Sequence, residues 1–348
     1  MERRKSKEIK IGSVKIGADH PIAVQSMTFT KTANADATVK QILSLERAGC
    51  DIVRFSVPDE ESAKSISYIK EHTHIPLVAD IHFNYKLALA ALERGIDKIR
   101  INPGNIGSPE RIKAVADACR MRGVPIRIGV NGGSLEKHIL AKYGSPTPEA
   151  LCESALYHVR LLEQFDFTDI VVSIKSSDVA DTVRANRLFA EKTDYPLHLG
   201  VTEAGTERMG IIKSSAGIGS LLLDGIGDTI RVSLTDEVEK EVAAARDLLK
   251  ALGLRGGVNI VSCPTCARTN IDVIGLATRL HALLDDCEKS IKVAVMGCAV
   301  NGPGEAKDAD IGIAGGLGEA LLIKHGKIVG KIPEDRVIET LMAEIEKL

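Results

Sequence analysis

The sequence predicts an α/β protein, with a (β/α)8 TIM-type barrel followed by a small α+β domain. Eight short runs rich in Val and Ile recur through the first 234 residues, and amphipathic helical segments such as 35–49 and 108–123 lie between them. Successive runs begin 22 to 44 residues apart, which is enough for one strand, one helix and two short loops. A different pattern of strands and helices fills the rest of the chain, roughly ninety residues.

The eight expected barrel strands lie at 22–27, 52–57, 76–81, 98–103, 126–131, 170–175, 197–202 and 229–234. Eight strand–helix units over about 250 residues have the size and count of a (β/α)8 barrel. A doubly wound open sheet is the alternative, but it usually has fewer strands, and no GxGxxG motif follows the first run. The long interval before the sixth strand is expected to hold a loop, 137–150, with room to cover the barrel mouth. A helix is expected over 236–253, after the eighth strand.

The small domain follows a break at LRGG, residues 254–257, where the helical pattern stops. We therefore expect one domain over 1–254 and a second over 255–348. The second is expected to contain a strand at 258–263, a helix at 272–287, and strands at 291–300 and 309–315. A hairpin turning near 324–327 and a final helix at 334–348 complete it.

Net charge and composition narrow the possible function classes. The 348 residues include 45 basic and 47 acidic side chains, so bulk attraction to nucleic acid or to an anionic membrane is not expected. Aromatic residues make up 3% and Trp is absent, which disfavours stacking on nucleic-acid bases. The charged start MERRKSKEIKIG is not a secretory signal, and no apolar run is long enough to span a bilayer. We expect a cytoplasmic protein, in which cysteines do not form a disulfide framework.

Three cysteines in the small domain predict a metal centre. Cys263 and Cys266 form a CxxC pair at the end of one expected strand and Cys298 ends another, so all three can gather at one end of a sheet. Glu305, behind a turn at 303–304, is the nearest oxygen ligand. A carboxylate ligand would be unusual for structural zinc, whereas three thiolates with one labile ligand suit a [4Fe–4S] cluster. The remaining cysteines are expected to be small core residues: Cys50, Cys119, Cys152 and Cys287.

Cationic side chains recur inside the expected barrel. Five of the eight strands carry one in an otherwise apolar run: Arg54, Arg100, Arg127, Lys175 and Arg231. Barrel strands are buried on both faces, and buried cations need anionic partners. Asp80 and Glu203 are too few to pair all five, so a phosphate or diphosphate ligand is predicted, although about one of the cations is expected to pair with an acid elsewhere in the barrel. Other polar residues lie near the same strand ends: His82, Asn102 and Asn131.

Ten motifs spread over nearly the whole chain carry a family resemblance: VQSMT, VRFSVP, ADIHF, RINPGN, RIGVNGGSLE, SIKSSD, TEAG, GDTIRVSLT, CPTC and GCAVNGPGE. The chain resembles the 4-hydroxy-3-methylbut-2-enyl diphosphate synthase (IspG/GcpE) family in its short bacterial two-domain form. The resemblance implies a homodimeric oxidoreductase of non-mevalonate isoprenoid biosynthesis. Such an enzyme opens 2-C-methyl-D-erythritol 2,4-cyclodiphosphate and removes its C3 oxygen as water, with two electrons from reduced flavodoxin or ferredoxin.

The same resemblance assigns roles to residues of this chain. It implies a [4Fe–4S] cluster on Cys263, Cys266, Cys298 and Glu305, and it implies Glu203 as proton donor to the departing oxygen. A carboxylate is easier to displace from iron than a thiolate, so a substrate oxygen could take the place of Glu305. It implies that six side chains bind the diphosphate: Arg54, Arg100, Asn102, Arg127, Asn131 and Lys175. The roles of Arg231, Asp80 and His82 stay open.

Two other functions remain compatible with the residues alone. One is a phosphate-dependent barrel, such as an aldolase or a pterin-binding transferase, whose tail is braced by zinc. The other is an electron-transfer or nucleic-acid-binding module in the small domain. Histidines in helix or loop contexts are expected to be solvated or core residues rather than ligands: His72, His74, His158, His281 and His325.

Overall fold

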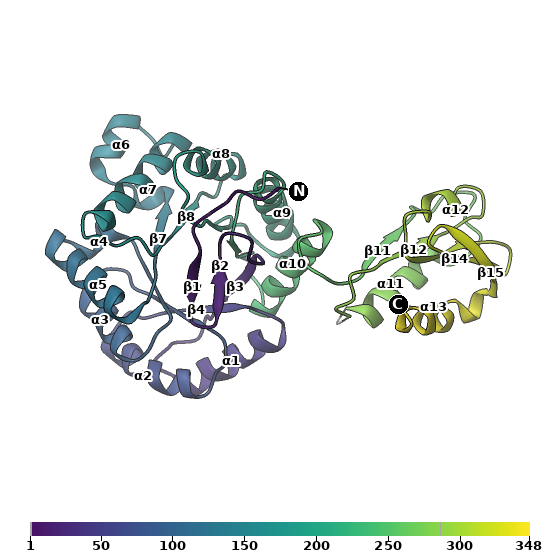
Figure 1. Ribbon diagram of the computed structural model, residues 1–348, viewed down its shortest axis with the longest axis horizontal. Coiled ribbons are helices and arrows are strands. Elements are labelled where there is room, and N and C mark those ends of the chain that lie inside the picture. Colours follow the sequence, from purple (N-terminus) through teal and green to yellow (C-terminus); the bar gives the residue numbers. More distant parts are fainter. Residues whose placement is uncertain (1, 286) are drawn as a thin grey trace. The chain divides into compact units, whose positions relative to one another are not determined.

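The computed structural model describes residues 2–285 and 287–348, which form two compact units (Figure 1). The first unit is Met1–Leu252 and the second is Gly253–Leu348, so the division falls two residues before the end of the first domain suggested by the sequence. Each unit has its own sheet and its own hydrophobic clusters.

The first unit is a closed barrel of eight parallel strands, which confirms the predicted fold. The strands are β3 (Ala23–Met27), β4 (Ile52–Ser56), β5 (Leu77–Asp80), β6 (Lys98–Ile101), β7 (Ile126–Asn131), β8 (Ile170–Lys175), β9 (His198–Leu199) and β10 (Thr229–Ile230). Neighbours along the chain pair in order, and β10 pairs with both β9 and β3. A parallel bridge between Val172 and Leu197 joins β8 to the β9 segment and closes the ring.

Helices surround this ring of strands (Figure 1). The long ones are α1 (Ala35–Arg47), α2 (Glu60–Glu71), α3 (Tyr85–Glu93), α5 (Pro109–Arg122), α7 (Pro148–Glu163), α8 (Val179–Ala190), α9 (Glu207–Leu223) and α10 (Val238–Ala251). Helix α1 is an example of why these segments are helical. The Asn34 side chain accepts a hydrogen bond from the backbone N–H of Ala37, which caps the helix, and Val39, Ile42 and Leu45 bury one face.

An N-terminal hairpin closes one end of the barrel. It was not predicted from the sequence. It consists of β1 (Ile9–Ile11) and β2 (Val14–Ile16), paired antiparallel. Its isoleucines pack against residues near the beginning of four barrel strands: Ala23, Ile52, Val78 and Val171. Runs of three residues are too short to stand out as strands in a sequence. Because the hairpin covers the end where the strands begin, the opposite end, where barrel enzymes bind their substrates, is left for a site.

Two further expectations about the barrel need correction. The segment 137–150 is not one loop, because it contains the short helix α6 (Lys137–Tyr143) and the start of α7. The last two barrel strands are only two residues long, whereas six residues were expected for each. The β9 ladder stops where Gly200 lies against Lys175, since a Cβ at Gly200 would come within 2.7 Å of the lysine Nζ.

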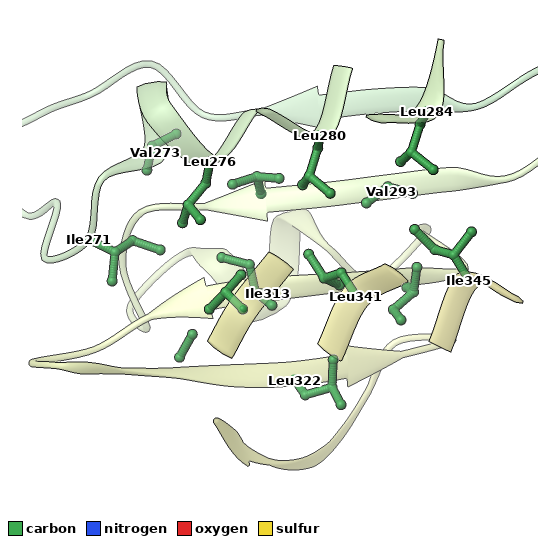
Figure 2. Close-up of a cluster of buried hydrophobic side chains, with 14 residues drawn as sticks. Ile271, Val273, Leu276, Leu280, Leu284, Val293, Ile313, Leu322, Leu341 and Ile345 are labelled. Atoms are coloured by element: carbon green, nitrogen blue, oxygen red, sulfur yellow. The ribbon is translucent and has the colours of Figure 1, made fainter. Parts of the chain in front are cut away.

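The second unit is a five-stranded sheet whose two long helices pack on one face. Its strands are β11 (Asn259–Ser262), β12 (Lys292–Met296), β13 (Ile311–Gly315), β14 (Glu319–Lys324) and β15 (Lys327–Pro333), in that order across the sheet. The first three are parallel and the last three antiparallel. Figure 2 shows Leu276, Leu280 and Leu284 of α11 (Val273–Leu284) and Leu341 of α13 (Val337–Glu346) in the core beside the sheet.

This α+β arrangement agrees with the expected order of elements. Residue 286, inside the helix expected over 272–287, lies outside the described residues. The turn expected at 303–304 is one turn of helix, α12 (Gly302–Glu305). The 3-10 helix Glu334–Arg336 leads into the last helix. Among the described helices, none combines the length and the apolar character that crossing a membrane requires.

Candidate active site

The predicted cations meet in one cavity of about 290 Å³ at the carboxyl end of the barrel strands. All five contribute to its lining, together with serines and a threonine from the same strand ends and the loops that follow them: Arg54, Arg100, Arg127, Lys175, Arg231, Ser56, Ser173, Thr202 and Ser233. Two glycines make room for the long side chains. A Cβ at Gly129 would lie 2.5 Å from two Arg100 guanidinium nitrogens, and Gly200 lies against Lys175 in the same way.

Asp80 compensates two of these cations. Its carboxylate lies 3.0 Å from Arg100 Nη1 and 3.8 Å from Arg54 Nε, and the Asp80 side chain is 5% exposed. Burial alone would raise the pKa of Asp80, but the charges of Arg54 and Arg100 hold it below its ordinary value. The carboxylate is therefore ionised and positions both guanidinium groups.

Arg231 pairs with Glu241, an acid that sequence reasoning missed. The guanidinium Nε and Nη2 each lie 3.2 Å from a Glu241 carboxylate oxygen, and the Ser26 hydroxyl donates to the same carboxylate. Glu241 belongs to α10, where it shares the buried face with Val238 and Ala245. A charge within the apolar stripe of that helix was the signal that could have identified it.

Arg127 and Lys175 have no carboxylate partner in the described part of the chain. Both are almost fully buried, and Arg127 Nη1 donates only to the Gln25 side-chain oxygen at 3.3 Å. Burial and the neighbouring cations lower the pKa of Lys175 and of Arg127 well below their ordinary values. Five cations face two carboxylates here, which leaves three charges uncompensated. An anionic ligand is the natural counterion for such an excess.

Two interior residues below this cavity were not anticipated. Lys98 precedes Arg100 by two residues on the same strand, is fully buried, and has no hydrogen-bond partner for its Nζ among the described residues. Burial and the nearby Arg127 and Arg54 lower its pKa well below the ordinary lysine value. His198 is also fully buried, donates to or accepts from the Thr229 hydroxyl at 2.8 Å, and has a pKa lowered by burial and by Arg127. Lys98 could have been predicted to face the barrel interior, because in the run KIRI it lies two residues before Arg100 and so points to the same side of the strand.

The remaining predicted residues occupy different positions around the mouth. Asn131 ends β7 and, like His82, lines the cavity. Asn102 is buried behind it and caps the short helix α4 (Pro103–Ile106) by accepting a hydrogen bond from the Gly104 N–H at 3.0 Å. Glu203 is exposed after Thr202 and has a φ of 53°, a backbone conformation rare outside glycine. Such strained positions concentrate at functional sites.

In the second unit, two of the predicted cysteines follow neighbouring parallel strands. Cys263 comes directly after β11, and Cys298 lies two residues after β12. The Gly297 N–H donates to Cys263 Sγ at 3.1 Å, and the Cys263 N–H donates to the Val295 carbonyl. Cys266 lies in the exposed loop between them, where its N–H donates to the Thr269 hydroxyl at 3.1 Å.

The surroundings of Cys266 and Cys298 favour thiolates, which are the form that binds metals. Hydrogen bonds from the backbone and side chain of Arg268 lower the pKa of Cys266. Backbone N–H groups of Asn301 and Val300 lower the pKa of Cys298, and the charge of Arg268 adds to the effect. Arg268 therefore contributes to the lowered pKa of both thiols.

Three thiols and a nearby carboxylate are a donor set that could hold an iron–sulfur cluster. In residues 2–285 and 287–348, no three His, Cys, Asp or Glu side chains converge closely enough to hold one metal ion. A four-iron cluster is wider, and each of its ligands binds a different iron. Glu305 ends α12, is exposed, and can supply a carboxylate as fourth ligand. Two observations support this donor set. Cys263 and Cys298 follow neighbouring parallel strands, and the pKa values of Cys266 and Cys298 are lowered.

The other cysteines do not resemble this group. Cys50, Cys119 and Cys152 are buried, and Cys287 is half-buried against the core of the second unit. Burial raises the pKa of Cys50 to about 12 and also raises the pKa of Cys119. These thiols are protonated at neutral pH, as expected for core residues.

A larger cavity of about 480 Å³ lies on the outside of the barrel, among α6, α7 and α8. Its charges largely compensate one another, since Lys142 lies 2.6 Å from Glu153 and the Tyr143 hydroxyl donates to the same carboxylate. Three cations and two carboxylates line it, so its excess is one positive charge, against three at the barrel mouth. The barrel mouth is therefore the better candidate for an anion site.

The barrel is similar to solved barrels with low sequence identity. A 3-dehydroquinate dehydratase from Geobacillus kaustophilus aligns with a TM-score of 0.52 and 17% identity over 72% of this chain and 98% of its own. A dihydropteroate synthase from Xanthomonas albilineans aligns with a TM-score of 0.51 and 19% identity over 71% of this chain and 98% of its own. At these identities the similarity concerns the fold alone.

Curated relatives match over the full length. A protein of Caldicellulosiruptor saccharolyticus is 59% identical over 99% of both chains, and one of Ruminiclostridium cellulolyticum is 56% identical over 100% of this chain and 99% of its own. Both are named 4-hydroxy-3-methylbut-2-en-1-yl diphosphate synthase (flavodoxin). The family model of the GcpE TIM-barrel domain matches residues 6–246, and that of the GcpE protein C-terminal domain matches residues 259–347. With both domains matched in order, the chain belongs to the GcpE family.

Proposed function

We propose that this chain is an oxidoreductase that converts 2-C-methyl-D-erythritol 2,4-cyclodiphosphate to 4-hydroxy-3-methylbut-2-enyl diphosphate, a step of non-mevalonate isoprenoid biosynthesis. The observation that supports it most is the barrel mouth, where five cations face two carboxylates. The reaction breaks one carbon–oxygen bond to the diphosphate and removes the C3 oxygen as water, with two electrons and a proton consumed. The diphosphate thereby gains one negative charge.

The barrel cations are suited to hold this substrate. Arg54 and Arg100, oriented by Asp80, can each present two parallel N–H groups to phosphate oxygens. Arg127 and Lys175 supply charges that no carboxylate of the described chain neutralises. Asn131 at the cavity wall and Asn102 behind it are proposed to add neutral hydrogen bonds. The charge excess also suits the product, which is more negative than the substrate.

Glu203 is proposed to supply the proton that converts the departing oxygen to water. It follows Thr202, which lines the cavity, and its positive φ turns the chain at the rim of the barrel. A carboxylic acid donates a proton effectively only when its pKa is raised toward neutral pH, and a bound dianion would have that effect. Glu203 is exposed, so a bound substrate could reach its carboxyl group.

Family membership implies an iron–sulfur cofactor, and we propose a [4Fe–4S] cluster held by Cys263, Cys266, Cys298 and Glu305. When bound, the cluster would supply single electrons and a Lewis-acidic iron. The thiols of the chain favour binding because hydrogen bonds stabilise the thiolates of Cys266 and Cys298. A carboxylate binds iron less tightly than a thiolate, so Glu305 would be the exchangeable ligand.

Flavodoxin is the electron donor named for the curated relatives, and we propose it, or a ferredoxin, as the donor here. We also propose a homodimer. Both partners can be tested with purified protein, by mass measurement in solution and by electron transfer from reduced flavodoxin.

The proposed function is tested by anaerobic purification followed by iron and sulfide analysis, an absorbance spectrum and turnover with reduced flavodoxin. We expect a brown protein with about four iron and four sulfide per chain. In the variant Arg127→Ala the substrate Kd should rise about ten- to a hundredfold, because a charge-assisted bond to phosphate contributes about 1.5–3 kcal/mol. A colourless protein with stoichiometric zinc, or wild-type affinity in Arg127→Ala, would contradict the proposal.

A further inference from the structure

A buried histidine–glutamate pair lies beneath the loops that carry the two asparagines. Nε2 of His158, in α7, hydrogen-bonds Oε1 of Glu136, in the segment between β7 and α6. The His158 side chain is 0% exposed and that of Glu136 is 12% exposed. Burial alone would raise the pKa of Glu136, but the hydrogen bond and charge of His158 lower it to about 2. Glu136 is therefore an ionised carboxylate at neutral pH, held by the imidazole.

The loop after β6 rests directly on this pair. A Cβ built on Gly104 would lie 3.0 Å from His158 Cε1, 3.3 Å from Asn102 Oδ1 and 3.4 Å from Glu136 Oε1. The same Gly104 donates its N–H to Asn102 Oδ1 at 3.0 Å. Because the side-chain oxygen of Asn102 is used by Gly104, its NH₂ group is the part left for a ligand.

The loop after β7 is tied to the same pair over a short stretch of chain. Asn131 ends the strand, the 3-10 helix Gly132–Ser134 follows, and Glu136 comes five residues after Asn131. The Ser134 hydroxyl donates back to the Asn131 carbonyl at 3.2 Å, and the Glu136 carbonyl accepts the Leu140 N–H that starts α6. Movement of Glu136 would therefore be passed to Asn131.

A purely stabilising role does not account for a charged pair at this place. Burying an ion pair removes both groups from water, and this cost often cancels the attraction between them, so an apolar pair of similar volume would be at least as stable. A directional hydrogen bond instead fixes the distance between the two chain segments that carry it. The pair lies where two loops with proposed ligand-binding amides meet a barrel helix.

We propose that the His158–Glu136 pair fixes the relative positions of the loops that carry Asn102 and Asn131, so that both amides can bind the diphosphate. This inference rests on the proposed function, because it takes the two amides to contact substrate. Neither His158 nor Glu136 touches the substrate itself. Loss of the pair acts through the asparagines, so it weakens ground-state binding more than it slows the chemical step.

The test uses the holoenzyme and measures the Kd of the cyclic diphosphate by calorimetry, together with KM and kcat. His158→Leu removes the imidazole at similar size, and the Kd and KM should rise about five- to one-hundred-and-fiftyfold, since two neutral hydrogen bonds of about 0.5–1.5 kcal/mol each are misdirected. kcat should change by less than about threefold. His158→Gln keeps an N–H donor for Glu136 and should recover most of the affinity.

Two further variants keep the test decisive if His158→Leu folds poorly. Gly104→Ala leaves the pair intact but places a methyl group against His158 and Asn102, so it should also raise the Kd. His20→Leu is the matched control, because His20 Nε2 lies 2.6 Å from the Glu8 carboxylate in another His–Glu pair, by the N-terminal hairpin. It should leave the Kd unchanged.

The outcomes separate this inference from the proposed function. Wild-type Kd in folded His158→Leu and Gly104→Ala would overturn the positioning role, as would an equal loss of affinity in His20→Leu. If the wild type binds the cyclic diphosphate and the variants bind it weakly, but no variant or wild type reduces it, the positioning role stands and the proposed reaction is wrong. Failure of the wild type to bind overturns both.

Discussion

Replacement of Asp80 by Asn tests the charge balance of the barrel mouth. The side chain keeps its size but loses the charge that faces Arg100 at 3.0 Å and Arg54 at 3.8 Å. Removing one partner of a buried ion pair costs about 3–5 kcal/mol, because the remaining charge stays buried without compensation. For a domain of this size each kcal/mol shifts the Tm by about 2–4 °C, so the ligand-free barrel should melt about 6–20 °C lower.

A diphosphate ligand should restore most of this loss, because its oxygens can replace the missing carboxylate beside the two guanidinium groups. A ligand at a hundred times its Kd stabilises any protein by about 2.7 kcal/mol. At one fixed ligand concentration the tighter binder gains more, so the ligand-induced rise in Tm should be larger in Asp80→Asn than in the wild type. Differential scanning calorimetry with and without the cyclic diphosphate measures both quantities.

The matched control is Asp97→Asn. Asp97 lies 2.7 Å from Lys70 Nζ and accepts the Leu77 N–H, and it does not line the cavity. This variant should lower the Tm without changing the ligand-induced rise. Equal ligand-induced rises in Asp80→Asn and wild type, or an unchanged Tm in ligand-free Asp80→Asn, would refute the assigned charge balance.

The difference in unfolding free energy between the wild type and Asp80→Asn should depend on pH, and the direction of that dependence follows from the pKa of Asp80. The folded-state pKa of Asp80 is lowered, so its contribution to stability is complete above the ordinary Asp pKa of about 3.9. It is lost as the pH falls through the lower folded-state value. The difference in unfolding free energy between wild type and Asp80→Asn should therefore be constant from about pH 5 upward and shrink in acid.

Three further predictions concern the cluster ligands and the barrel interior. Cys298→Ser should lose most of its iron after anaerobic reconstitution, whereas Cys152→Ser should keep it; equal loss in both would contradict the ligand assignment. Glu305→Cys should keep its iron, because a thiolate binds iron more tightly than a carboxylate, but lose turnover, and near-normal turnover would show that exchange of this ligand is not needed. Lys98→Met should raise the free energy of unfolding by about 1–3 kcal/mol, because it removes a buried amino group that has no hydrogen-bond partner among the described residues; a lower Tm would show that Lys98 finds an acceptor in solution.

The barrel could be predicted because its strands are apolar runs at a regular spacing, a property of the sequence alone. The hairpin at its closed end could not, because Ile9–Ile11 and Val14–Ile16 are too short to stand out. The ends of β9 and β10 were misplaced for a different reason. The apolar pattern continues past Leu199 and Ile230, but the paired strands end at those residues, and an apolar pattern does not report where backbone pairing stops.

The cations of the site were predictable because charge in a buried strand is unusual. Their partners were less so, since Glu241 comes from a helix rich in acidic residues, where only the position on the buried face distinguishes it. The His158–Glu136 pair was missed because a helical histidine reads as a solvated or core residue, and its partner is 22 residues away. Such contacts depend on tertiary packing, which local periodicity does not encode.

The most direct test of the proposed reaction follows electrons and phosphorus together. Purified protein with its cluster is reduced anaerobically and mixed with a limited amount of the cyclic diphosphate, and phosphorus NMR counts cyclic and linear diphosphate while absorbance counts the electrons consumed. We predict one linear diphosphate for every two electrons. A protein with full iron content that leaves the cyclic diphosphate unchanged, or opens it without consuming electrons, would contradict the proposed function.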